Sequence, residues 1–214
     1  ETSLKCYNSS FKNNNATMLG GGIISIKSKN LDSGFWFISS LKTIKLLIEE
    51  GVDIIDIGAC STRPGAKLVE AKEEIEKIIP LLKTLKKEFP ETIISIDTVW
   101  AEVSKAVVDN GADIINDISG GNFDKNMLKT IGELKVPYIL THCKETPDKM
   151  QDNPNYNNHI IELSQYFSQR IDTLYNYGAK DIILDLGFGF DATEDDVVRC
   201  FTELADLDCV LSVD

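Results

Sequence analysis

The feature that most constrains the fold of this chain is a repeating unit, in which a helical segment is followed by a short apolar run and then a polar loop. Apolar runs that predict strands occupy 22–26, 51–55, 93–96, 111–115, 136–140, 181–184 and 210–213. Segments with helical spacing of apolar residues alternate with them, at 35–50, 71–89, 101–110, 125–134, 159–177 and 193–204. The apolar runs lack a clean period of two, which is typical of parallel strands covered by helices.

This alternation predicts an α/β protein, and more narrowly a TIM (β/α)8 barrel with the C-terminal strand and helices missing from this chain. A closed barrel needs every strand, because a gap leaves two unpaired edges. Residues 1–17 are polar and Asn-rich, and we interpret them as a tail or linker, so that the incomplete barrel domain occupies 18–214. The glycines before several strands are expected at helix C-termini. A Rossmann fold has little support, because the glycines at 20–22 precede the first strand instead of following it.

Composition limits the possible partners. The chain of 214 residues is 43% hydrophobic and 26% charged, which suggests neither a disordered nor a membrane protein. A net charge of −12 argues against nucleic acid or a membrane surface as a partner. Five scattered cysteines without a CxxC pair favour a reducing, cytoplasmic compartment and give no zinc pattern. The Lys/Glu-rich segment 70–88 is interpreted as a solvated helix face.

Polar side chains gather where the predicted strands end, and in a barrel these ends share one face. They are Ser25, Thr62 with Arg63, Asp97 with Thr98, Asn116 with Asp117, His142, and Asp185. Asp and Asn suit an aminopyrimidine-like edge, because both accept from its N–H groups and Asn can also donate. Arg63, flanked by hydroxyls and glycine, suits an anion such as phosphate or carboxylate.

Two simpler interpretations of these residues stay open. Asp97-Thr98 and Asn116-Asp117 are also residue types that cap helices. His142 is either a base or a packed, hydrogen-bonded residue, and no neighbouring residue in the sequence activates it.

Four segments carry a resemblance to the dihydropteroate synthase family of pterin-binding barrels. Asp-Ile-Gly-Ala-Cys-Ser-Thr-Arg-Pro-Gly-Ala at 56–66 is similar to the family's Ser-Thr-Arg-Pro-Gly loop. Ser-Ile-Asp-Thr at 95–98, Asp-Ile-Ile-Asn-Asp-Ile-Ser-Gly-Gly at 113–121 and Asp-Leu-Gly-Phe-Gly-Phe at 185–190 follow in the family's order and spacing. The resemblance covers about residues 18–214.

The resemblance implies an enzyme of folate biosynthesis that joins p-aminobenzoate to hydroxymethyl-dihydropterin diphosphate and releases diphosphate, with Mg2+ as cofactor. It implies pterin binding by Asp97, Asn116 and Asp185, with Thr62 and Arg63 beside the diphosphate and the aminobenzoate. Thr62, Arg63 and Asp185 are accordingly the candidate catalytic residues. It also implies a cytoplasmic homodimer, and fusion to other folate-pathway domains.

Other positions depart from the family pattern. Ser25 stands where the family has an Asn associated with metal and diphosphate, so Ser25 is the metal candidate, as a shorter ligand. Asp191-Ala192 replace a small residue and a pterin-contacting Lys, and the cation-bearing Ser-Arg-Lys segment is expected beyond Asp214. A catalytically impaired pterin-binding pseudoenzyme therefore remains an alternative. A pterin-dependent methyltransferase is a further one, against which the Ser-Thr-Arg-Pro-Gly loop argues.

Overall fold

The computed structural model describes residues 23–27, 33–49, 51–59, 69–143, 159–186 and 210–212. Its strands are β1 (Ile23–Lys27), β2 (Ile54–Gly58), β3 (Ile93–Asp97), β4 (Ile114–Asp117), β5 (Tyr138–Thr141), β6 (Ile182–Asp185) and β7 (Val210–Ser212). Its helices are α1 (Ser33–Glu49), α2 (Ala71–Glu88), α3 (Ala101–Val108), α4 (Met127–Leu134) and α5 (His159–Tyr177).

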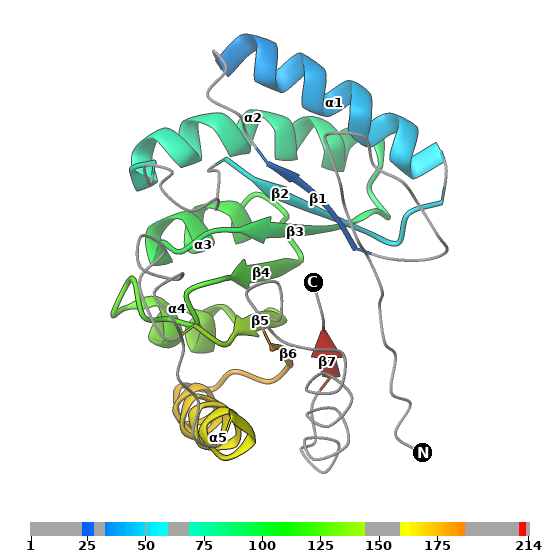
Figure 1. Ribbon diagram of the computed structural model, residues 1–214. Helices are drawn as coiled ribbons and strands as arrows, with labels where there is room; N and C mark the ends of the chain where they lie inside the picture. Colours follow the sequence, from blue (N-terminus) through cyan, green and yellow to red (C-terminus); the bar gives the residue numbers. More distant parts are fainter. Residues whose placement is uncertain are drawn as a thin grey trace.

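The strands form one parallel sheet in which spatial order follows chain order, from β1 to β7. The helices follow one another along the outside of this sheet (Figure 1). Sequential parallel strands with a helix in each connection from β1 to β6 are the arrangement of a (β/α) barrel, so the α/β class is confirmed. The helix predicted at 193–204 lies outside the described residues. Within the described part, none of the helices has the length and apolar character that crossing a membrane requires.

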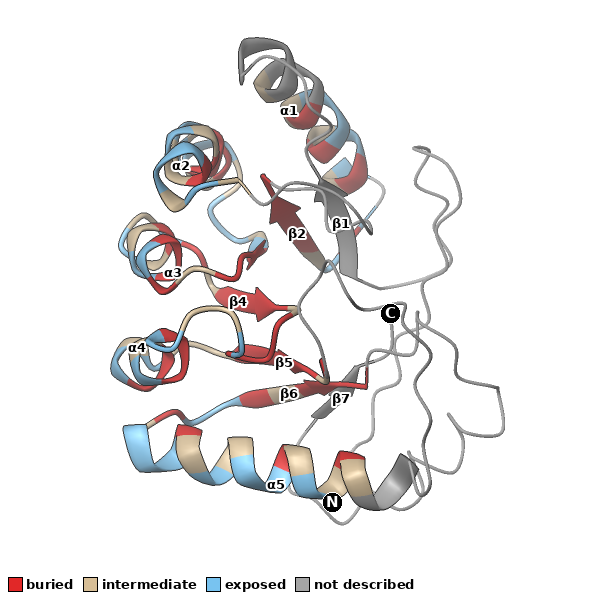
Figure 2. Ribbon diagram, turned by 60° about the vertical axis from the view of Figure 1, so that its left-hand side comes forward, coloured by how far each residue is buried: buried red, intermediate tan, exposed pale blue. Residues whose placement is uncertain are grey.

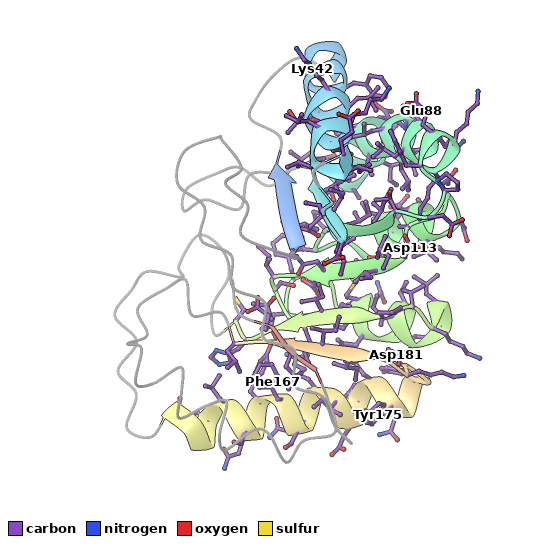
Figure 3. All side chains as sticks on the ribbon, turned by 90° about the vertical axis from the view of Figure 1, so that its right-hand side faces the viewer. Lys42, Glu88, Asp113, Phe167, Tyr175 and Asp181 are labelled. Atoms are coloured by element: carbon purple, nitrogen blue, oxygen red, sulfur yellow. The ribbon has the colours of Figure 1, made fainter. Side chains whose placement is uncertain are left out.

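The hydrophobic core lies between the sheet and the helices. Alternate strand residues such as Ile55, Ile94 and Ile115 are fully buried there against Ile78 of α2 and the other core side chains. The buried faces of α2, α3 and α4 are turned toward the strands (Figure 2). Phe167, likewise fully buried, lies between α5 and the sheet (Figure 3). Helix-facing strand residues therefore hold the fold together, which leaves the other face of each strand for polar groups.

Several strands begin later than the apolar pattern predicts, because the preceding glycine ends a helix. Gly51, Gly111 and Gly178 have φ values of 85°, 101° and 96°, in the left-handed region that favours glycine. This confirms the expected helix C-termini. At the other end, β3, β4 and β6 run through Asp97, Asp117 and Asp185, so these residues end strands instead of following them.

A charged clamp lies at the amino ends of the strands. Lys86 Nζ is 2.6 Å from Asp113 Oδ2 and donates to the Thr92 carbonyl at 2.8 Å. Asp113 Oδ2 also accepts from the Ile94 amide at 2.8 Å. Asp113 and Asp181 mark this end of the sheet in Figure 3. The amino ends are thus joined by structural contacts, and the candidate site lies at the carboxyl ends. In barrel enzymes the amino ends of the strands serve stability, and the carboxyl ends carry the active site.

Candidate functional site

The strand register brings polar residues of β1 to β4 onto one face of the sheet. Ser25 is paired with Asp56, and Asp56 with Ser95. Asp97, two residues after Ser95, is paired with Asn116. Paired residues of parallel strands share a face, as do residues two apart on one strand. Ser25, Asp56, Ser95, Asp97 and Asn116 therefore lie on the same face, opposite the helices.

The same face continues through β5 and β6. Asn116 is paired with Ile139, and Thr141, two residues further on, is paired with Asp185. Asp185 is in turn paired with Ser212 of β7. Four of the residues that the sequence singles out, Ser25, Asp97, Asn116 and Asp185, thus belong to one inner face.

Side-chain contacts join members of this face. Asn116 Nδ2 donates to Asp56 Oδ2 at 3.4 Å, across the intervening strand β3. Thr141 Oγ1 donates to Asp185 Oδ2 at 3.0 Å. Asp56, Asp97, Asn116 and Asp185 are between 1% and 7% exposed. Three carboxyl groups and an amide are therefore withdrawn from bulk water on one surface.

Asn116 has an unused acceptor at this surface. Its buried Oδ1 makes no hydrogen bond to any residue that the structure describes. Buried polar atoms are nearly always hydrogen-bonded, and those that are not call for an explanation. A ligand N–H group would satisfy Asn116 Oδ1.

Gly58 at the end of β2 leaves room for the Asp97 side chain. A Cβ at Gly58 would lie 3.3 Å from both Cβ and Oδ2 of Asp97. That separation is shorter than ordinary van der Waals contact between carbon atoms. A side chain at position 58 would therefore crowd the Asp97 carboxylate.

Helix capping does not account for Asp97. Helix α3 begins at Ala101 after Trp100, which makes no side-chain capping bond, and the Ala101 amide donates to Asp124 Oδ2 at 3.0 Å. Asp97 is the last residue of β3, three residues before Trp100. Asp97 is therefore not the N-cap residue of α3.

Asp117 differs from Asp97 because it does not face the pocket. The prediction that it belongs to the pocket residues is wrong. It follows Asn116 on β4, so its side chain points to the helix side. Its carboxylate accepts from the Ser119 amide and hydroxyl at 2.8 and 2.6 Å, the Gly121 amide at 2.8 Å and the Tyr138 hydroxyl at 2.7 Å. Burial raises the pKa of Asp117, and these hydrogen bonds oppose the rise. Asp117 therefore stabilises the turn after β4.

His142 packs against aromatic side chains, as the second of its two interpretations predicts. Its ring meets that of Tyr166 edge to face, with centroids 4.8 Å apart. The Tyr166 hydroxyl donates to the Thr141 carbonyl at 3.2 Å, and burial raises the pKa of Tyr166 to about 12. This contact fastens α5 to the carboxyl end of β5.

Two acidic residues of the site region were missed in the sequence. The predicted strand at 51–55 stops short of Asp56, although a carboxylate inside the apolar run 54–57 indicates a functional strand position. Glu74 was assigned to a solvated helix face, and that is wrong, since it is only 2% exposed. Its spacing of four from the buried Ile78 is the pattern that could have identified it.

Other predicted residues lie beyond what the structure describes. Thr62 and Arg63 fall outside the described residues, as do Asp191 and Ala192, and for Ser25 only the backbone is described. Across the described ranges, no group of three or more His, Cys, Asp or Glu residues is placed to hold a metal ion. The metal role of Ser25 and the need for Mg2+ therefore stay predictions.

Comparison with known proteins agrees with this geometry. The model of the family described as "Pterin binding enzyme" matches residues 27–213. The dihydropteroate synthase of Synechocystis is 38% identical over 191 residues, which are 87% of this chain and 66% of that protein. The mitochondrial folate synthesis bifunctional protein of Pisum sativum is 37% identical over 196 residues, which are 87% of this chain but 38% of that protein.

Solved structures give the same result. The dihydropteroate synthase of Yersinia pestis, solved with a sulfonamide drug complex, has a TM-score of 0.79 at 27% identity over 90% of this chain and 72% of its own. The enzyme of Xanthomonas albilineans with 4-aminobenzoic acid has a TM-score of 0.75 at 28% identity, covering 90% and 71%. The chain therefore spans about two thirds of a single-function synthase, and its sheet is a partial TIM barrel. It belongs to the pterin-binding enzyme family, as a homologue of dihydropteroate synthase.

Proposed function

We propose that this chain provides the pterin pocket of a dihydropteroate synthase, which joins p-aminobenzoate to hydroxymethyl-dihydropterin diphosphate. The observation that carries the proposal is the strand register, which puts Asp97, Asn116 and Asp185 on one buried face together with Asp56. Buried acceptors on a single surface are what the amino and ring N–H groups of a pterin need.

Asn116 and the carboxylates would each bind different polar groups along the pterin edge. The unused Asn116 Oδ1 would accept a pterin N–H, and Nδ2 can donate to a ring nitrogen or to the Asp56 carboxylate. Asp97 and Asp185 would accept from the remaining N–H groups, and Thr141 holds the Asp185 carboxylate by its hydroxyl. A flat, donor-rich heterocycle is thereby preferred over a simple anion, which carboxylates repel.

The reaction needs positioning more than acid–base chemistry. The bond between the pterin methylene carbon and the diphosphate oxygen breaks, and the electron pair leaves with the diphosphate. The aminobenzoate nitrogen then forms the new bond to the methylene carbon and releases a proton to water. Asp185 would stabilise the positive charge that develops on the pterin methylene, and Thr62 and Arg63 would hold the anionic groups.

Magnesium would serve by neutralising the diphosphate charge. Ser25 shares the inner face with Asp56, and it could offer one hydroxyl oxygen, a ligand type that Mg2+ accepts. One hydroxyl does not make a metal site, and we assign no step of the reaction to a metal.

A catalytically impaired pterin-binding protein is the second candidate. It is favoured by Asp191-Ala192, which stand where the resemblance leads us to expect a pterin-contacting Lys. A carboxylate in that place repels a diphosphate instead of attracting it. Pterin binding would then be retained and turnover lost.

Calorimetry with 6-hydroxymethylpterin and its diphosphate, followed by an assay for dihydropteroate, tests both candidates. Pterin binding together with diphosphate-dependent product supports the synthase, and binding without product supports the impaired form. Asp185→Ala is expected to weaken pterin binding about tenfold or more, because it removes a charged acceptor. Unchanged binding by Asp185→Ala would contradict the pocket.

The family resemblance also bears on assembly and location. We propose a cytoplasmic homodimer, with the polar segment 1–17 as a link to a further folate-pathway domain. The bifunctional pea relative supports such a fusion, and its name also identifies it as a mitochondrial protein. Sedimentation of the full natural protein would check the dimer.

A further inference from the structure

Glu74 is a buried acid beside the pterin pocket that the proposed chemistry does not use. It lies in the first turn of α2 and is 2% exposed, whereas Glu73 of the same turn and Glu76 just after it are exposed. Its Oε1 makes no hydrogen bond to any residue in the described ranges. Its carboxyl group lies close enough to the Thr98 side chain and to the Asp97 carboxylate for both to act on its pKa, Thr98 lowering it and the charge of Asp97 raising it. Glu74 therefore lies against the turn that follows β3.

Thr98 connects this turn to strand β4. Its amide donates to the Asn116 carbonyl at 2.9 Å, and its hydroxyl oxygen accepts from the Trp100 amide at 3.2 Å. Asp97 precedes it directly on the chain, and Thr98 is itself 2% exposed. A displacement of Thr98 would therefore move the Asp97 carboxylate and the Asn116 backbone together.

The protonation state of Glu74 bears on this turn. Burial, with a further contribution from the charge of Asp97, raises the pKa of Glu74 from an ordinary 4.5 to about 8, against the opposing effects of Thr98 and Lys77. From β3 the charged group is Asp97, and from α2 it is Lys77, which also pairs with Glu73 at 2.8 Å. Helices α1 and α3, which flank α2, contribute no charge to this pKa within the described part.

We propose that Glu74 is a positioning residue of the pterin pocket, which holds the Asp97–Thr98 turn in the geometry that presents the Asp97 carboxylate to the ligand. A neutral carboxyl at position 74 fills the buried space beside Thr98 without repelling Asp97. An ionised one puts a second negative charge beside Asp97 in a water-poor environment, where like charges interact strongly. The inference rests on the proposed pterin pocket and adds to it a prediction that pterin affinity falls as Glu74 loses its proton.

The test is calorimetry with 6-hydroxymethylpterin from about pH 6.5 to about pH 9, on the wild type, Glu74→Gln and Glu74→Ala. If only the neutral form binds well, the wild-type dissociation constant rises about tenfold between about pH 7 and pH 9, as a single deprotonation requires. Glu74→Gln keeps a hydrogen-bonding group without a charge, so its affinity is expected to vary less than about twofold over that range. Glu74→Ala leaves a cavity beside Thr98 that lets the turn shift, and it is expected to bind about tenfold more weakly at neutral pH.

Glu76→Gln is the matched control, because it removes an exposed carboxylate from the same helix. It should reproduce the wild-type pH curve, and ionisation of the ligand itself would appear in all variants alike. Thermal unfolding checks each variant, and if Glu74→Ala does not fold, Glu74→Gln carries the test alone. If Glu74→Gln loses as much affinity at high pH as the wild type does, the proposed role of Glu74 is wrong. Absence of pterin binding by the wild type at every pH overturns the proposed pocket itself, and this inference with it.

Discussion

Asn116 donates a hydrogen bond from Nδ2 to Asp56 Oδ2 over 3.4 Å, although β3 lies between their strands. A flat sheet would keep side chains of β2 and β4 apart, because neighbouring strands alone are about 4.8 Å from each other. The contact therefore reflects the inward curvature of a barrel, where alternate strands fill a common layer. This contact brings Asp56 into the pocket, where the sequence alone did not place it.

Asp56→Asn should weaken pterin binding. The substitution keeps the shape of the side chain but removes a buried charge that can accept from both Asn116 and a ligand N–H. Hydrogen bonds to charged groups contribute about 1.5–3 kcal/mol, so we expect a loss of about tenfold to a hundredfold in affinity by calorimetry. Asp53→Asn, an exposed position just before the same strand, is the control and should bind normally.

Thr141→Val should weaken pterin binding more modestly. Valine has the shape of threonine but cannot donate to Asp185 Oδ2, so the 3.0 Å bond is lost and the carboxylate is held less firmly. The lost bond acts on the ligand only through the position of Asp185, so we expect about a fivefold change in affinity, or about 1 kcal/mol. A Val variant that binds as tightly as the wild type would show that Asp185 is oriented by other groups.

Gly58→Ala tests whether the space beside Asp97 matters. The new methyl group would lie 3.3 Å from Asp97 Cβ and Oδ2, so the carboxylate must shift by a few tenths of an ångström. We expect a pterin affinity reduced by about threefold to tenfold, with a melting temperature within a few degrees of the wild type. A large loss of stability with unchanged affinity for the folded fraction would mean that Gly58 serves the fold instead of the pocket.

The architecture could be predicted from the sequence because its physical basis is local. Apolar runs bounded by glycines, such as Gly51 and Gly111, indicate strands after helix ends, and their alternation with helices implies a parallel sheet. The strand bounds were less accurate. Asp97 and Asp185 continue the hydrogen-bonded ladder despite their charge, since the inner face of the sheet accommodates polar side chains.

The site was predictable only in part, because the direction of a side chain depends on register. Asn116 and Asp117 are adjacent and were grouped together, yet one faces the pocket and the other the helices. The burial of Glu74 depends on how α2 lies against β3, which composition does not reveal. Asp56 is placed beside Asn116 by the curvature of the sheet, a property of the assembled barrel and not of either segment.

Gly132→Ala should destabilise the fold without touching the pocket. Gly132 of α4 lies against α5, and a Cβ there would come within 2.4 Å of the Tyr177 carbonyl oxygen, a backbone atom that cannot rotate away. Overpacking of this kind costs about 1–3 kcal/mol, which we expect to see as a lower denaturant midpoint. Lys129→Ala, an exposed change on the same helix, is the control and should alter stability by less than about 0.5 kcal/mol.

The stability of the wild type relative to Glu74→Gln should fall as pH rises. Glu74 has an ordinary pKa of 4.5 in the unfolded chain and one of about 8 in the folded protein. The folded state therefore retains a proton that the unfolded state releases, so the contribution of Glu74 is fully present below about pH 4.5 and is lost progressively up to about pH 8. The loss approaches about 1.4 kcal/mol per pH unit inside that window.

Glutamine does not titrate, and the raised pKa of Asp117 is common to both proteins and cancels in the difference. Paired thermal or urea unfolding at several pH values should thus give a stability difference that moves steadily in favour of Glu74→Gln between about pH 5 and pH 8. Glu76→Gln, with its exposed side chain, should instead follow the wild type at every pH. A difference between Glu74→Gln and the wild type that stays constant over this range would mean that Glu74 is already ionised in the folded protein, and that its burial is compensated by a cation.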